Sequence, residues 1–149
     1  MFTLLQLDKT NKPKVASPYK VLEDYAKLFE VESDGLLEGW QHTSVGRNTG
    51  KDTGKDTGDD TIVYHTLHVS IPSLQGYSFQ LLEVSQLGPR FYPVRVTLFT
   101  GHSSISPPEE YSSESDLRKG IEKLLSREEA QQILSDLAEQ ARIAQDKAA

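Results

Sequence analysis

The spacing of hydrophobic residues changes along the chain from a helical to a strand pattern and then back again. In the segment 17–35, apolar residues recur at steps of three and four, which predicts an amphipathic helix. The apolar positions of this helix are Leu22, Tyr25, Ala26 and Phe29. Ser17 is suited to cap the helix, Pro18 to open its first turn and Gly35 to end it.

Alternating apolar and polar residues follow and predict β-strands. The strand segments are 36–45, 61–71, 77–87 and 91–99, and 2–7 is a further candidate for a short strand. The connections after the second and third of the four main segments are short, so the last three strands should form an antiparallel meander. Pro93 indicates that the final segment is an edge strand or begins late.

Helical spacing returns after a loop rich in serine and proline. The apolar positions are Leu117, Ile121, Leu124 and Leu125, then Ala130, Ile133, Leu134, Leu137 and Ala141. Gly120 weakens the first of these two helices, and Ser126 with Glu129 matches a capping box for the second. We expect residues 145–149 to fray. The whole chain, 1–149, is predicted to be a single α+β domain: an antiparallel meander of four or five strands, with an N-terminal and two C-terminal helices on one face.

Composition limits the partners and the chemistry. The net charge of −6 argues against nucleic acid, and the basic run Lys9, Lys12 and Lys14 is interpreted as a solvated turn. The chain has no cysteine, which excludes disulfides, thiol catalysis and cysteine zinc sites. Neither a signal peptide nor an apolar run of about 20 residues is present. We therefore expect a soluble, cytoplasmic protein that does not contact membranes.

A tandem repeat, TGKD-TGKD-TGDD, lies in the segment 46–60. Its Asp-Thr-Gly triplets resemble those of aspartic proteases, but Asp52 and Asp56 are too close in sequence to form that dyad. The glycines are one residue too close for a phosphate-binding loop, and neither register of a calcium loop ends in glutamate. Weak cation binding by Asp56, Asp59 and Asp60 stays open. The preferred interpretation of 46–60 is a long flexible hairpin loop.

Other catalytic patterns are incomplete. His65 and His68 should point to opposite faces of one strand, so we predict no metal site and no cofactor. Gly101, His102 and Ser103 begin like a nucleophile elbow, but Ile105 stands where the last glycine belongs. Scattered carboxylates, among them Glu83, show no acid–base spacing. These patterns favour a protein that is not an enzyme, without deciding the question.

The alternation within the strands identifies a second candidate surface. Val63, Leu67, Val69 and Ile71 share one face of their strand, and other strands show a similar aliphatic side. If these sides pack on the helices, the reverse of the sheet presents Trp40, His42, Tyr64, His68 and Arg95. Aromatic residues with arginine are typical of interface hot spots, although such residues also form ordinary cross-strand pairs. The segment 77–87 does not fit, because its apolar residues fall on both faces.

Taken together, these features favour a small acidic, non-catalytic protein that binds a protein partner through those five residues. Regulators, inhibitors, immunity-type proteins and adaptors all fit this description, and a homodimer formed through the C-terminal helix is a further option. The alternative is a small enzyme or small-molecule-binding protein with a pocket between sheet and helices. Its polar groups would be His42, His65, His68 and Arg95.

Overall fold

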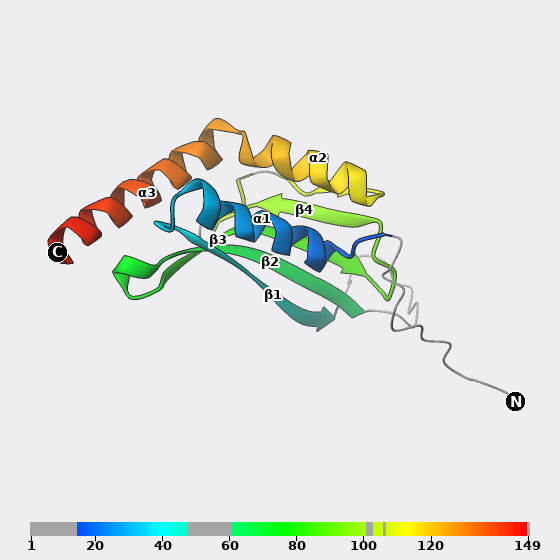
Figure 1. Cartoon of the computed structure of the whole chain (residues 1–149). Helices are drawn as coiled ribbons and strands as arrows, with labels where there is room; N and C mark the ends of the chain where they lie inside the picture. The colour runs from blue at the N-terminus through cyan, green and yellow to red at the C-terminus, as the bar shows by residue number, and fades with distance from the viewer. Residues whose placement is uncertain (1–14, 48–60, 101–102, 106, 149) are drawn as a thin grey trace, which may run out of the picture.

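The chain forms one antiparallel sheet with three helices on the same side (Figure 1). The computed structural model describes residues 15–47, 61–100, 103–105 and 107–148. Its elements are α1 (Pro18–Glu32), β1 (Glu38–Arg47), β2 (Thr61–Ile71), a 3-10 turn (Pro72–Leu74), β3 (Tyr77–Leu87), β4 (Val94–Leu98), β5 (Glu109–Tyr111), α2 (Glu114–Leu125) and α3 (Glu128–Ala148). The five strands are neighbours in chain order and all pairs are antiparallel. The predicted α+β meander is confirmed, while the candidate strand 2–7 and the aspartates of the repeat lie outside the described residues.

Helix α1 begins and ends where its sequence signals indicate. The backbone N–H of Lys20 donates to Ser17 Oγ at 3.2 Å, and Pro18 occupies the first turn. At the other end, Gly35 has a φ of 81° and its N–H donates to the carbonyl of Glu30 at 2.9 Å. This left-handed conformation is one that glycine adopts without strain.

One face of α1 packs directly on β1 at a glycine. A Cβ at Gly39 would lie 2.6 Å from the Cα and 2.8 Å from the carbonyl carbon of Ala26. Glycine therefore allows the backbones of α1 and β1 to meet. Further along β1, Val45 is exposed, although it shares the helix side of the strand with Gly39, because α1 does not cover this end.

A one-residue shift in strand pairing explains the ambiguous segment 77–87. Leu67 of β2 pairs with Leu82 of β3, whereas the next residue, His68, pairs with Gln80. Leu81 is the extra residue of this bulge, and both Leu81 and Leu82 are fully buried. The shift resets the alternation, so that β3 presents one apolar side to the helices despite its sequence pattern.

β4 starts late, after Pro93, which is one of the two outcomes that Pro93 predicted, and it is an inner strand because Val94 pairs with Tyr111 of β5. The C-terminal part differs from the prediction in two places. β5 was not predicted, because this strand has only three residues and follows the serine- and proline-rich loop. Ser126 ends α2 rather than capping α3: its hydroxyl donates to the Glu122 carbonyl at 2.6 Å.

Three elements extend beyond the positions that the sequence pattern indicates. β1 continues through Gly46 and Arg47, which the sequence assigned to the loop, and α3 continues to Ala148, into the predicted tail. α2 begins three residues before its first apolar position, Leu117, because Ser113 caps it by accepting from the N–H of Asp116.

Within the described part of the chain, no helix combines the length and the apolar character needed to cross a bilayer.

Candidate functional site

The sheet face opposite the helices, called the open face below, carries all five predicted binding residues. Cross-strand pairing places Trp40 opposite His68 and His42 opposite Thr66. On the next strands, Glu83 pairs with Thr66 and Thr97, and Ser85 pairs with Arg95. The side chains of the open face are those of Glu38, Trp40, His42, Ser44, Ile62, Tyr64, Thr66, His68, Ser70, Ser78, Gln80, Glu83, Ser85, Leu87, Arg95, Thr97 and Glu110. The strand alternation thus brings residues from five strands onto one surface.

Two aromatic rings are fixed on this face by stacking and hydrogen bonds. The rings of Trp40 and His68 lie 4.0 Å apart and are parallel to within 8°. Trp40 Nε1 donates to Ser70 Oγ at 2.7 Å, and His68 Nε2 lies 2.8 Å from Thr66 Oγ1. The Trp40 side chain is held in one orientation and is still 38% exposed.

The open face is acidic. Its carboxylates belong to Glu38, Glu83 and Glu110 and its guanidinium to Arg95, which lies 3.8 Å from Glu110. Burial raises the pKa of Glu83, which is partly covered near the centre of the sheet. A carboxylate in this position is poorly hydrated, so a cation beside it would be favoured.

Burial of the His68 imidazole favours its neutral form. Burial, and to a smaller extent the nearby His42, lower the pKa of His68, because the charged form loses hydration and would be repelled by a second imidazolium. In the Trp40–His68 stack, the lowered pKa favours an uncharged imidazole against the indole ring. This stack is an apolar part of a face that also carries the exposed Leu87.

His65, by contrast, lies on the helix side of the sheet. Its Nε2 is 2.9 Å from Gln86 Oε1 and its Nδ1 is 2.9 Å from Thr43 Oγ1, and the ring of Tyr19 in α1 meets it edge-on at 6.1 Å. Because an amide oxygen only accepts, Nε2 carries the proton and Nδ1 accepts from Thr43. Burial lowers the pKa of His65. His65 and His68 thus point to opposite faces, as predicted.

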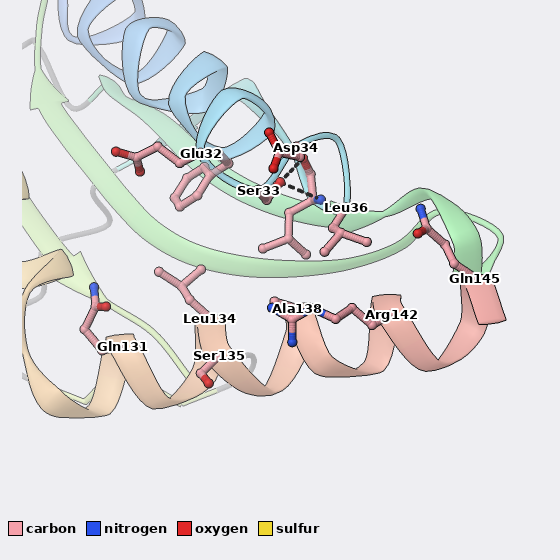
Figure 2. A pocket seen from close by; sticks show the side chains of 12 residues that line it. Glu32, Ser33, Asp34, Leu36, Gln131, Leu134, Ser135, Ala138, Arg142 and Gln145 are labelled. Atoms are coloured by element: carbon pink, nitrogen blue, oxygen red, sulfur yellow. Dashed lines mark hydrogen bonds between the residues drawn. The ribbon is translucent and has the colours of Figure 1, made fainter.

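A groove of about 660 Å³ lies between the end of α1 and α3. Figure 2 shows the end of α1 and the turn after it on one side, with Leu134 and Arg142 of α3 on the other. Its floor is apolar, from Phe29, Leu36, Leu37, Leu134 and Ala138. Ser33 Oγ is engaged locally, since it accepts from the N–H of Leu37 at 2.9 Å, and Arg142 pairs with Glu139 at 2.9 Å. None of the four polar residues expected of a catalytic pocket lines this groove.

A second hollow, of about 620 Å³, extends from the Trp40–His68 stack. It is lined by Trp40, His68, Tyr77, Ser78, Phe79, Gln80 and Thr100. Only one of the four polar residues of the alternative hypothesis, His68, lies there. This hollow therefore enlarges the open face next to its aromatic anchor without assembling a set of converging polar groups.

The described residues offer no obvious reaction centre on this face. They contain no group of three histidine, aspartate or glutamate residues that could hold a metal ion. Glu83 is flanked across the strands by Thr66 and Thr97 rather than by a second titratable group. Gly101 and His102 of the elbow-like sequence are outside the described residues, and Ser103 is exposed.

Sequence reasoning missed Glu83 as a member of the open face. The bulge between β2 and β3 displaces the alternation of β3 by one residue, so counting from Phe79 misplaces the side chains that follow Leu81. The cross-strand neighbour Thr66, which shares its face of β2 with Tyr64 and His68, is the signal that could have located Glu83.

No protein-family model, curated protein or solved structure matches this chain. The arrangement of the open face and of the two hollows is therefore the basis for a functional assignment.

Proposed function

We propose that this protein is a cytoplasmic, non-catalytic binding protein whose open face holds a basic protein partner. The observation that carries the proposal is the exposed Trp40 ring, held in a parallel stack on His68 within an acidic sheet face. A regulator, inhibitor, immunity-type protein or adaptor would use such a surface.

The Trp40–His68 stack has the properties of an interface anchor. Tryptophan is enriched among hot-spot residues, where truncation to alanine costs about 2 kcal/mol or more. Trp40 already has its indole N–H bonded to Ser70, so little conformational freedom remains to be lost on binding. Its exposed surface is then available for burial by the partner.

Charge favours a basic partner. The open face has three carboxylates against one guanidinium, and the chain as a whole carries −6. A lysine or arginine placed near Glu83 would pair with a carboxylate that burial has already desolvated. An arginine could in addition stack on Trp40. Complementary charge also accelerates association and makes it sensitive to salt.

The alternative of an enzyme or small-molecule-binding protein has less support. Its four polar residues are divided, with His65 on the helix side and His42, His68 and Arg95 on the open face. A ligand pocket needs polar groups that converge on one cavity, and the groove between α1 and α3 and the hollow beside the Trp40–His68 stack contain at most one of the four.

Site-specific photo-crosslinking tests the proposal. A photo-reactive amino acid is placed at Ser85 or at Thr97 on the open face, and at Gln132 on α3 as the control. We expect the two open-face positions to crosslink the same basic protein in host extract, and this crosslink to decline as salt is raised. Crosslinks to that partner from Gln132 alone, or equal crosslinks from all three positions, would contradict the proposal.

A further inference from the structure

The outer edge of β1 is a long strand edge without the usual protection. β1 has 10 residues and pairs with β2 in one uninterrupted register, from Glu38 opposite Ser70 to Arg47 opposite Thr61. No strand of the described residues pairs with its other side. Proteins block exposed edges with lysine, proline, bulges or very short strands, and β1 contains none of these.

The opposite edge of the same sheet shows the contrast. β5 has only three residues, and two of them are Glu109 and Glu110. A short, charged edge resists pairing with another chain. Among the described strands, β5 therefore resists strand addition and β1 has an edge that no strand pairs with.

We propose that β1 pairs antiparallel with β1 of a second copy of this chain, which joins two five-stranded sheets into one. This inference is independent of the partner proposed for the open face. An antiparallel pair of identical strands has a two-fold axis, so each strand satisfies the other's free N–H and carbonyl groups in the same way.

Access to this edge follows from the path of α1. Ala26 of α1 lies on Gly39 in the first half of β1, whereas Tyr19, near the start of α1, lies against His65 of β2. The helix thus crosses from β1 onto β2, and the arrowhead end of β1 lies away from it (Figure 1). Successive side chains in this half, Thr43 to Val45, are exposed, so both faces of the strand can be approached.

The charges of β1 favour a second copy in antiparallel orientation. The strand begins with Glu38 and ends with Arg47, and the residues between them carry no formal charge. Antiparallel pairing brings the glutamate end of one copy to the arginine end of the other. Parallel pairing would bring like charges together, which is unfavourable.

A two-fold axis at Thr43 gives a sterically consistent register. It places Trp40 of one copy opposite Gly46 of the other. In each copy the ring of Tyr64 lies over Gly46, because a Cβ on Gly46 would be 2.8 Å from Tyr64 Cε2. The two Gly39 residues would be about 26 Å apart at 3.3 Å per residue, so the two α1 helices do not compete for space. The open faces of both copies then form one continuous surface.

Sedimentation over a wide range of protein concentration tests the dimer. Val45→Lys adds a lysine at the edge, and Val31→Lys on α1 is the matched control, because Val45 and Val31 are 69% and 70% exposed. We expect the wild type and V31K to approach twice the chain mass with the same dissociation constant, and V45K to dimerise at least tenfold more weakly. A wild type that stays monomeric throughout, or equal dissociation constants for V45K and V31K, would overturn the proposal.

Disulfide trapping tests the register separately, because the chain has no cysteine of its own. Thr43→Cys should oxidise readily to a covalent dimer, whereas Val31→Cys should not. If T43C crosslinks no faster than V31C, the axis at Thr43 is refuted. If Ile143→Lys on α3 abolishes dimerisation while V45K leaves it unchanged, self-association belongs to the C-terminal helix instead.

Discussion

Replacing Gly39 by alanine tests the contact that positions the open face relative to α1. The added methyl group would lie within 2.8 Å of the Cα, carbonyl carbon and carbonyl oxygen of Ala26. Non-bonded carbon atoms prefer separations of about 3.5–4.0 Å. These neighbours are backbone atoms of a helix, so they cannot rotate away, and α1 must move by about 1 Å.

Such a movement loosens the packing of fully buried α1 residues, Val21 and Leu22 among them. Overpacking of this kind costs about 1–3 kcal/mol, and the upper half of that range applies because the obstacle is backbone. Replacing a strand glycine by alanine also stabilises the folded state by about 0.5–1 kcal/mol, because glycine loses more conformational entropy on folding. We therefore expect the free energy of unfolding to fall by roughly 1–2.5 kcal/mol, which lowers the melting temperature by about 2–10 °C for a chain of this size.

Urea unfolding followed by far-ultraviolet circular dichroism measures this change, at a low protein concentration where self-association is absent. Gly46→Ala is the matched control on the same strand, since its new methyl group would meet the edge of the Tyr64 ring, which can turn aside. The reasoning is refuted if G39A is as stable as the wild type, or if G39A and G46A lose the same stability.

Three further predictions concern the helix side of the sheet. Because burial lowers the pKa of His65, the unfolded chain binds the proton more readily than the folded chain. The free energy of unfolding is therefore highest above pH 6.5 and falls as the pH drops through the folded-state pKa of His65. Between pH 8 and 5, the urea midpoint of His65→Gln should fall less than that of the wild type. Gly120→Ala should destabilise the protein despite about 1 kcal/mol of added helix propensity, because its methyl group would occupy the position of the Tyr111 ring. In a Tyr111→Ala background, the same substitution should stabilise the protein. Arg118→Met removes the ion pairs with Asp24 at 3.0 Å and with Glu114 at 2.9 Å. It should cost about 2 kcal/mol or less, and the loss should shrink in concentrated salt.

Side-chain alternation was sufficient to predict that the five candidate residues share one face of the sheet. The period-two pattern of 61–71 put Tyr64 and His68 on the face away from Leu67, and pairing with β1 then placed Trp40 beside His68. Local signals also fixed the start of α1 at Ser17 and Pro18. These features depend on short-range geometry, which a sequence encodes directly.

Features that depend on distant residues could not be predicted. The bulge opposite Leu67 and His68 is a property of two paired strands, so Glu83 was not assigned to the open face. β5 has only three residues, too few for a periodic pattern. The stack of Trp40 on His68 joins residues that are distant in sequence but opposite each other in the sheet, and strand register was not fixed by the sequence alone.

The most direct test of the account is the affinity of the crosslinked basic partner for the wild type and for Trp40→Ala. Phe91→Ala is the control, because Phe91 is an aromatic residue of similar exposure, 40% against 38%, in the connection between β3 and β4. If Trp40 is the anchor of the open face, W40A should weaken binding by about 30-fold or more, equivalent to about 2 kcal/mol, while F91A binds as the wild type does. Equal dissociation constants for W40A and the wild type, with both proteins folded by circular dichroism, would contradict the assignment of the open face as the binding surface.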